Sequence, residues 1–267
     1  MIFPLIGIAL GAYAVLVGGL FLFQRQLLYF PDRTRPELAG LAPIGVREVK
    51  LSTDDGVSLL SWYLPAWSGR PVIAYFHGNG GHIGYRAERL MRFAREGYGV
   101  LMAEYRGYGG NPGTPTETGF YADGRAALAF LQHEGVAVNR IVLYGESLGG
   151  GVAVELAAHH DIAALILEAP VTSVAEVAQS HYPFVPASRM VLDRFDLVAR
   201  IGRIRAPILV LHGERDRVVR IRYGRALFDA APEPKEAWFA PEAGHEDLAR
   251  YGGLDVAVAF IERRLAG

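Results

Sequence analysis

Ser147 is the residue whose surroundings most clearly predict chemistry. It lies in the motif GESLGG at 145–150, between a short apolar run at 141–144 and a helix-like run at 152–158. A serine at so sharp a strand-to-helix turn has a strained backbone and lifts its hydroxyl clear of the sheet, which suits a nucleophile. The Leu148 amide, at the start of the helix, can bind a developing oxyanion. The alternative is a glycine-rich turn that merely contains a serine, but the strand and helix on either side favour the nucleophile.

A second glycine-rich segment, HGNGG at 77–81, follows an apolar strand expected at 71–76. Glycines let backbone amides approach a substrate oxygen closely, so we expect the Asn79 amide to be the second oxyanion donor, beside that of Leu148. A phosphate-binding turn is the alternative, but no G-x-x-x-x-G-K-[ST] or G-x-G-x-x-G pattern follows. We expect Glu146 to be structural, because a carboxylate pointing inward would oppose oxyanion formation.

Five motifs follow one another along the chain: HGNGG, EYRGYGG, GESLGG, HGERD and AGHED. Their order resembles the α/β-hydrolase superfamily, and within it the membrane-anchored serine hydrolases of the Bem46/ABHD13/ABHD17-like group. The resemblance covers nearly the whole chain. Two positions depart from the family pattern. Glu104 stands where an Asp is usual, and Gly81-His82, at the end of the HGNGG loop, differs from the usual Ala-Gly-Asn. Neither change removes a catalytic atom, so both concern substrate specificity.

The remaining members of a catalytic triad are predicted by chain order. A serine needs a base to remove its proton, and the base needs an acid to orient it and stabilise its charged form. In this fold the order is nucleophile, acid, histidine. Of eight histidines only His245 lies beyond Asp216, so we predict His245 as general base and Asp216 as acid. Glu214 and Glu168 are competing acids.

The alternation of apolar runs and helix-like runs predicts an α/β fold with a mostly parallel eight-stranded sheet flanked by helices. An Asp-Gly turn at 53–56 predicts that the first two strands form an antiparallel edge. Strands are expected at 46–51, 57–64, 71–76, 100–105, 141–144, 163–168, 207–211 and 236–239.

Two clusters of arginine are interpreted as solvated surface. One is a helix at 85–95, with arginines at threefold spacing. The other is the segment 200–225, with eight arginines against two acids, where a basic lip for anionic headgroups is the alternative. Within it, Arg215 and Arg217 are expected to keep Asp216 ionised.

The N-terminal residues 2–23 contain no charge and are long enough to cross a bilayer as a helix. A cleaved signal peptide is the competing interpretation, but the segment has no basic start and no small cleavage-site residues. We therefore predict an N-terminal membrane anchor at 1–24, a juxtamembrane connector at 25–45 and a catalytic domain at 46–267. Arginines after the anchor place that domain in the cytoplasm by the positive-inside rule.

Two further features bear on binding. Gly7 and Gly11 form a G-x-x-x-G pair that could support a homodimer through the anchor. The long connection at about 171–205 is expected to be a small cap, with Tyr182, Phe184 and Met190 lining an acyl site. Ordinary core helices are the alternative for this segment.

Composition excludes several function classes. At 267 residues with a net charge of −1, the chain suits one sizeable domain with no nucleic-acid partner. The absence of cysteine excludes disulfides, thiolate catalysis and cysteine-zinc sites. The histidines lack H-E-x-x-H spacing, so we expect neither a metal nor another cofactor.

These features together predict a serine hydrolase that cleaves carboxylic esters or thioesters of lipid-like or acylated substrates at a membrane. Two alternatives remain: a serine peptidase of the same fold and a non-catalytic membrane scaffold. A peptidase would need room for an extended chain beside Ser147. A scaffold would be expected to show a blocked pocket or a misplaced triad member.

Overall fold

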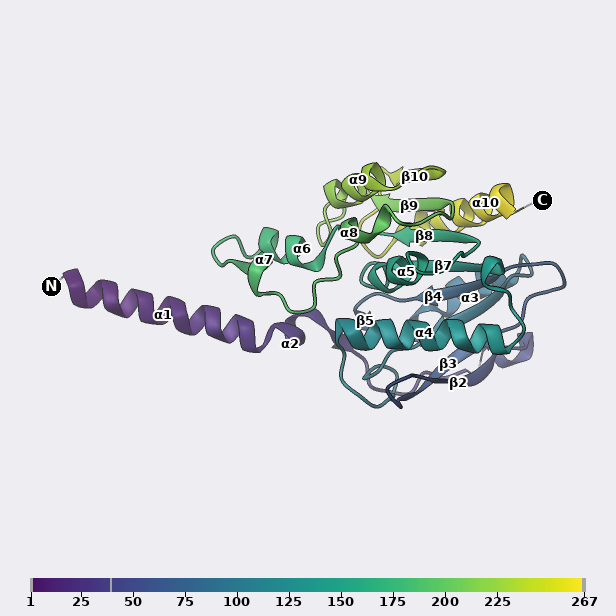
Figure 1. Ribbon diagram of the computed structural model, residues 1–267, viewed down its shortest axis with the longest axis horizontal. Coiled ribbons are helices and arrows are strands. Elements are labelled where there is room, and N and C mark those ends of the chain that lie inside the picture. Colours follow the sequence, from purple (N-terminus) through teal and green to yellow (C-terminus); the bar gives the residue numbers. More distant parts are fainter. Residues whose placement is uncertain (1, 39, 266–267) are drawn as a thin grey trace.

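An eight-stranded sheet forms the centre of the computed structural model, which describes residues 2–38 and 40–265 (Figure 1). The strand order is β10-β9-β8-β7-β4-β6-β3-β2, and only the pairs β2–β3 and β3–β6 are antiparallel. The predicted fold class and antiparallel edge are thus confirmed. The strands are β2 Arg47–Ser52, β3 Ser58–Leu64, β4 Val72–Phe76, β6 Gly99–Ala103, β7 Ile141–Glu146, β8 Ala164–Glu168, β9 Ile208–Gly213 and β10 Lys235–Ala240.

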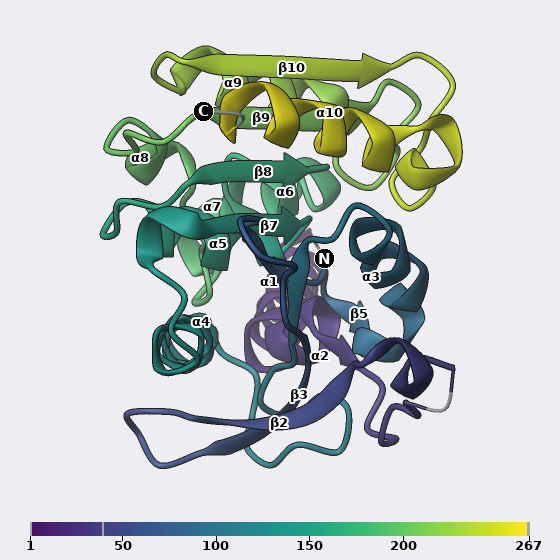
Figure 2. The same cartoon turned by 90° about the vertical axis from the view of Figure 1, so that its right-hand side faces the viewer.

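Helices cover both faces of this sheet (Figure 2). On one face lie α4 Glu117–His133, α5 Gly149–Ala157 and α9 Ile221–Ala230. On the other lie α3 Ala87–Ala94 and α10 Gly253–Leu265. Between β8 and β9 the chain forms α6 Val174–His181, α7 Ala187–Met190 and α8 Val198–Ile201. Four short 3₁₀ helices complete the connections at Ala42–Ile44, Ile83–Arg86, Val138–Arg140 and Leu248–Tyr251.

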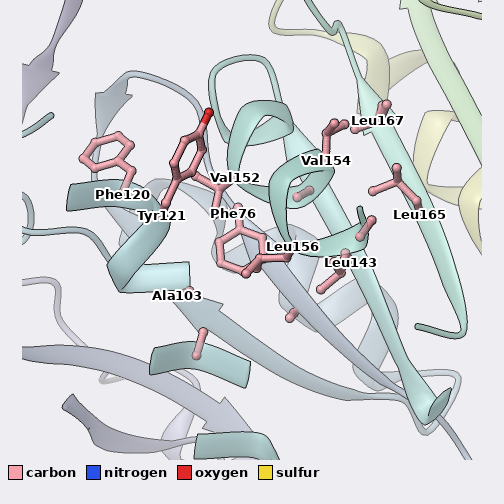
Figure 3. Close-up of a cluster of buried hydrophobic side chains, with 14 of the residues drawn as sticks. Phe76, Ala103, Phe120, Tyr121, Leu143, Val152, Val154, Leu156, Leu165 and Leu167 are labelled. Atoms are coloured by element: carbon pink, nitrogen blue, oxygen red, sulfur yellow. The ribbon is translucent and has the colours of Figure 1, made fainter. Parts of the chain in front are cut away.

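The core explains why the central strands are continuous apolar runs. Every residue of β4 and β6 is buried, as expected for parallel strands covered on both faces. Phe76 and Leu143 from the sheet belong to the same buried cluster as Phe120 from α4 and Val152 from α5 (Figure 3). The carboxyl ends of the strands are thereby fixed relative to α5, whose N-terminus carries the predicted nucleophile.

The arginine-rich helix α3 is not a solvated face throughout, and our interpretation of it is wrong for two residues. Arg89 is buried and Arg86 is mostly buried, and each binds a carboxylate at the end of a strand. Arg92 pairs with Glu96 and Asp255 at the partly exposed side of the helix. The threefold spacing therefore places two cations under the carboxyl edge of the sheet.

The N-terminal helix α1 Ile2–Leu22 projects away from the body of the protein (Figure 1). Its residues Phe3–Leu22 have a mean hydropathy of 2.3, and none of that window is buried, so it is long and apolar enough to span a membrane. Gly7 and Gly11 are exposed on it, and a homodimer through them stays a prediction.

After α1, the chain returns to the body in two short elements. Helix α2 Gln24–Leu28 follows, and then β1 Phe30–Pro31 pairs in parallel with β5 Gly80–Gly81. The segment predicted as a connector therefore begins with ordered structure that contacts the HGNGG loop.

Candidate active site

Ser147 lies at the junction of β7 and α5 in a left-handed backbone conformation, with φ at +49°. Non-glycine residues rarely adopt this region, and it marks local strain. The two flanking glycines make the turn possible. A Cβ on Gly145 would lie 2.5 Å from the Gly150 Cα, and one on Gly149 would lie 2.1 Å from the Phe76 carbonyl oxygen. The local sequence thus forces the serine to the apex of the turn.

The structure brings together the three residues predicted as a triad. The Oγ of Ser147 lies 3.1 Å from Nε2 of His245, and Nδ1 of His245 lies 2.7 Å from Oδ2 of Asp216. Asp216 follows β9 and His245 follows β10, so two neighbouring loops deliver the pair to the serine. With Asp216 ionised, Nδ1 carries the proton and Nε2 can accept the hydrogen of the serine hydroxyl.

Asp216 is buried and is held by groups other than the arginines expected to ionise it. Oδ1 accepts hydrogen bonds of 2.8 Å from the Val218 and Val219 amides, and Nε2 of His212 lies 3.2 Å from Oδ2. Burial by itself would raise the pKa of Asp216, but hydrogen bonds from His212 and His245 lower it well below its usual range. Arg215 forms an ion pair with Glu242 instead. His212 was not predicted as part of the site, although its place four residues before Asp216 was visible in the sequence.

The environment of His245 favours its protonated form. Burial lowers its pKa, but the hydrogen bond to Asp216 and the charges of Asp216, Glu146 and Glu246 raise it above the ordinary value of 6.5. A raised pKa strengthens the base that must take the serine proton. It also stabilises the imidazolium that forms when the proton is transferred.

The two predicted oxyanion donors have no hydrogen-bond partner within the described residues. Neither the Asn79 amide nor the Leu148 amide donates a hydrogen bond to any of residues 2–38 or 40–265. The Asn79 peptide is nevertheless fixed. Its carbonyl accepts from the Phe30 amide and from the Tyr108 hydroxyl, both at 2.9 Å, and its side chain donates to the Leu28 carbonyl at 2.7 Å. Donors fixed before the reaction are what oxyanion stabilisation requires.

Glu104 orients the loop that carries Asn79, a role that sequence reasoning missed. Its carboxylate is fully buried and binds Nε2 of His77 at 2.7 Å and the Ile83 amide at 2.9 Å. Nδ1 of His77 lies 2.7 Å from the Gly78 carbonyl. Glu104 was noted as a departure from the family pattern, and this departure was the signal that could have identified it.

The competing acids are occupied by arginines. Glu168 binds both terminal nitrogens of Arg89 at 2.5 and 2.8 Å and accepts a hydrogen bond from the Tyr144 hydroxyl. Glu214 is exposed and pairs with Arg225 at 2.7 Å. Neither reaches the histidine, whereas Asp216 does.

Glu146 is likewise engaged by a cation, as expected for a structural residue. Its carboxylate binds Arg86 at 2.8 and 3.2 Å and accepts a hydrogen bond from the Tyr75 hydroxyl. Burial opposes its ionisation, but Arg86 and Arg89 hold its pKa well below the usual range. The Glu146 carboxylate also packs against Gly78, which lies beside the nucleophile. A Cβ on Gly78 would lie 3.2 Å from Oε1 of Glu146 and 3.5 Å from the Cβ of Ser147.

Of the three residues predicted to line an acyl site, two line a cavity in the structure and the third does not. A cavity of about 400 Å³ lies between the α6–α7 region and the end of the N-terminal helix, and both Tyr182 and Met190 line it. Phe184 does not line it. The Phe184 side chain is 57% exposed, and its carbonyl accepts a hydrogen bond from the Tyr13 hydroxyl at 2.9 Å.

A second cavity, of about 590 Å³, lies in the Arg-rich segment and is lined by Glu214, Arg215, Asp216, Arg217, Arg220 and Ile221. The arginines of 200–225 include several in surface ion pairs, such as Arg200 with Glu155 and Arg205 with Asp161. No group of three or more histidine, aspartate or glutamate side chains arranged to hold a metal occurs among residues 2–38 and 40–265.

Comparison with known proteins identifies relatives over most of the chain. The profile of the family described as serine aminopeptidase, S33 (Hydrolase_4) matches residues 68–196. The chain is 41% identical to the uncharacterized protein Rv2307c of Mycobacterium tuberculosis over 259 residues, covering 93% of this chain and 92% of that one. It is 34% identical to human alpha/beta hydrolase domain-containing protein 17B over 197 residues, covering 73% and 67%.

Solved structures agree on the fold. The esterase Pf2001 of Pyrococcus furiosus superimposes with a TM-score of 0.73 at 18% identity, covering 90% of this chain and 99% of that one. An alpha-beta hydrolase from Vibrio vulnificus gives a TM-score of 0.71 at 23% identity, covering 84% and 83%. Sequence relatives and shared architecture lead to one conclusion: this chain belongs to the α/β-hydrolase superfamily and resembles alpha/beta hydrolase domain-containing protein 17B.

Proposed function

We propose that this protein is a membrane-anchored serine hydrolase that cleaves carboxylic esters or thioesters through an acyl-enzyme. One observation carries the proposal. The hydrogen-bonded series Ser147, His245 and Asp216 begins at a strained strand-to-helix turn, and the two amides expected to bind an oxyanion have no partner within the described residues. A strained serine, an oriented base and unused donors are the parts that acyl transfer requires.

In the acylation step Ser147 Oγ attacks the acyl carbon of the substrate while its proton passes to Nε2 of His245. The electron pair of the carbonyl moves onto oxygen, which the Asn79 and Leu148 amides bind. Asp216 stabilises the imidazolium and stays ionised. The intermediate then collapses, and His245 gives the same proton to the departing alcohol or thiol.

Deacylation repeats these steps with water. His245 takes a proton from the water molecule, whose oxygen attacks the acyl-serine, and the proton then returns to Ser147 Oγ as the acid departs. A serine at the turn, where an aspartate would support alkyl-enzyme chemistry, favours substrates with an acyl carbon.

The apolar helix α1 supports action at a membrane surface. Its length and hydropathy suit a single span, and the arginines that follow it favour a cytoplasmic catalytic domain. An acyl-cleaving site attached to such a span would meet lipids or acylated proteins more often than soluble esters.

A serine peptidase is the second candidate, and the name of the matching family, serine aminopeptidase, favours it. The same triad can cleave amides. Hydrolysis of aminoacyl p-nitroanilides at rates comparable to those of esters would support this alternative, and failure to cleave them would leave the ester or thioester assignment.

The test is hydrolysis of p-nitrophenyl acyl esters from acetyl to palmitoyl by the full-length protein in detergent micelles. We expect turnover that falls by roughly 10⁴-fold or more in Ser147→Ala and His245→Ala. The absence of turnover at every chain length, together with no cleavage of thioesters, would count against a catalytic role and favour a scaffold.

A further inference from the structure

A groove lies where the N-terminal helix meets the region between α6 and α7. Residues of the helix and its extension form one wall, and residues of 174–191, which we call the cap segment, form the other. The volume of about 400 Å³ is within the range of sites for small molecules. The lining residues are Leu20, Phe21, Gln24, Leu27 and Leu28 on the anchor side, and Val174, Val177, Ala178, His181, Tyr182, Val185, Ala187, Met190 and Val191 on the cap side.

The anchor side of the groove is fixed to the body of the protein. The Gln24 side chain accepts a hydrogen bond from the Leu192 amide at 2.7 Å. Arg25 forms a two-point ion pair with Asp193 at 2.8 and 3.3 Å, and that carboxylate, nearly buried, also accepts from the Glu117 amide. A charged pair with this burial and geometry holds α2 in place, so the wall persists without a ligand.

The cap segment lies beside the second half of α1. The Tyr13 hydroxyl donates to the Phe184 carbonyl at 2.9 Å, and Tyr13 is nine residues before Leu22, the last residue of α1. At ~1.5 Å per residue this is roughly 13 Å from the end of the helix, which is close to the midplane of a ~30 Å bilayer core that the helix spans. Phe184 and Leu192 expose apolar side chains here, as expected for a surface in contact with lipid.

One lining residue of the groove, Leu28, contacts the loop that carries Asn79. Leu28 lines the groove, and its carbonyl accepts the hydrogen bond from the Asn79 side chain at 2.7 Å. In the same loop, a Cβ on Gly78 would lie 3.5 Å from the Cβ of Ser147. On the anchor side the groove therefore runs from Leu20, near the end of α1, to Leu28, which contacts the loop beside Ser147, and none of Ser147, Asp216 and His245 lines it.

The chemistry of the lining indicates an apolar ligand. None of the lining residues is an aspartate, glutamate, lysine or arginine, and two of the polar ones are already used. Gln24 binds the backbone of the cap segment, and Nε2 of His181 lies 3.0 Å from the Val218 carbonyl. A polar ligand such as a peptide backbone would find few free partners here, whereas a hydrocarbon chain needs none.

We propose that this groove binds one fatty acyl chain of a membrane lipid ester, which enters sideways from the leaflet between α1 and the cap segment. The anchor is then part of the substrate site in addition to its role as a tether. The inference rests on the proposed function, because it assumes that the acyl carbon is delivered to Ser147. It adds the substrate class and names the anchor residues that select it.

The first test measures chain-length selectivity in the full-length protein reconstituted in phosphatidylcholine vesicles. We expect Leu20→Trp, which fills the groove from the anchor side, to lower the ratio of kcat/KM for p-nitrophenyl palmitate over butyrate by about tenfold or more. Leu22→Trp is the matched control because Leu22 is exposed on the same helix and does not line the groove. Tryptophan suits a membrane interface at either position.

A second pair of variants tests the opposite wall. Ala178→Trp on α6 is expected to reproduce the loss of selectivity, while Ala199→Trp, exposed on α8, should leave the ratio unchanged. An unchanged ratio in both Leu20→Trp and Ala178→Trp, or an equal fall in the controls, would overturn the proposal.

A binding readout separates this proposal from the proposed function. The catalytically impaired Ser147→Ala protein is placed in vesicles that contain a phosphatidylcholine with a diazirine on its acyl chain, and adducts are mapped by mass spectrometry. We expect adducts on residues 174–191 that are depleted in a Ser147→Ala/Leu20→Trp protein. Labelling of these residues without ester turnover in the wild-type protein would reject the hydrolase and keep the lipid groove. The absence of labelling there would reject the groove, and labelling displaced only by a soluble S-palmitoyl peptide would reject a membrane lipid ester as its occupant.

Discussion

Asp216 and Glu168 are two buried carboxylates at neighbouring positions in the sheet, and their surroundings differ in kind. Asp216, after β9, is held by two histidines and two backbone amides. Glu168, at the end of β8, is held by the guanidinium of Arg89, a permanent cation. Glu168 is bound to the Arg89 guanidinium and does not contact His245, whereas Asp216 is hydrogen-bonded to the histidine directly and can stabilise the imidazolium.

The comparison teaches how a fold rich in buried acids can reserve one of them for catalysis. Glu146 lies next to the nucleophile in sequence, yet it is ion-paired with Arg86, and Arg86 and Arg89 hold its pKa well below the usual range. Glu168 completes the same arrangement with Arg89. Arg86, just before α3, and Arg89, within it, are structural counter-ions, whereas the described contacts of Asp216 are with histidines and backbone amides.

The largest expected effect is the difference in kcat between a variant of Asp216 and a variant of Glu168. Asp216→Asn should lower kcat by roughly 10³- to 10⁴-fold, because the amide cannot stabilise the imidazolium and favours the wrong tautomer. Glu168→Gln should leave kcat per folded molecule within a few-fold of the wild-type value. Steady-state hydrolysis of p-nitrophenyl butyrate, normalised to folded protein, measures both. If Glu168→Gln loses turnover while Asp216→Asn keeps it, the acid assignment is wrong.

The next prediction compares the contributions of a buried and an exposed ion pair to the free energy of unfolding. Arg89→Leu leaves Glu168 buried without its cation, which should lower the free energy of unfolding by about 3–5 kcal/mol. Arg125→Leu breaks an exposed pair with Asp54 and should cost at most ~1 kcal/mol. Urea unfolding in detergent compares the two variants. Equal losses would show that the Arg89 pair is no more important than a surface pair.

The pH dependence gives a smaller and more specific effect. His245 must be neutral to act as a base, and its pKa lies above 6.5. The rate constant kcat/KM should therefore rise with pH through a transition above 6.5. The Glu146 charge also raises this pKa, so Glu146→Gln should move the transition to lower pH, toward the ordinary histidine value. A shift to higher pH in that variant would contradict the assigned electrostatics.

Much of the site was predictable because its signals are local. The glycines around Ser147 specify a turn that only small neighbours permit, and the chain order of Asp216 and His245 follows from the fold. The sheet was predictable because its buried strands are continuous apolar runs bounded by turn residues.

The supporting contacts were not predictable because they join distant segments. Arg89 and Glu168 are 79 residues apart, and helical spacing alone cannot distinguish a buried arginine from a solvated one. The groove depends on contacts such as that between Arg25 and Asp193, 168 residues apart, and no local pattern encodes how the anchor meets the cap segment. The place of Phe184 outside the groove could not be predicted for the same reason, since its carbonyl binds the distant Tyr13 while its ring packs against Tyr182.

The central claim is that Ser147 is a nucleophile activated by His245 and Asp216, and covalent labelling tests it most directly. The full-length protein is treated with an alkyl fluorophosphonate, and the mass of the intact protein is followed with time. We predict one adduct per chain on Ser147, no adduct in Ser147→Ala, much slower labelling in Asp216→Asn and a near wild-type rate in Glu168→Gln. Labelling that persists in Ser147→Ala, or that is equally fast in Asp216→Asn, would contradict the account.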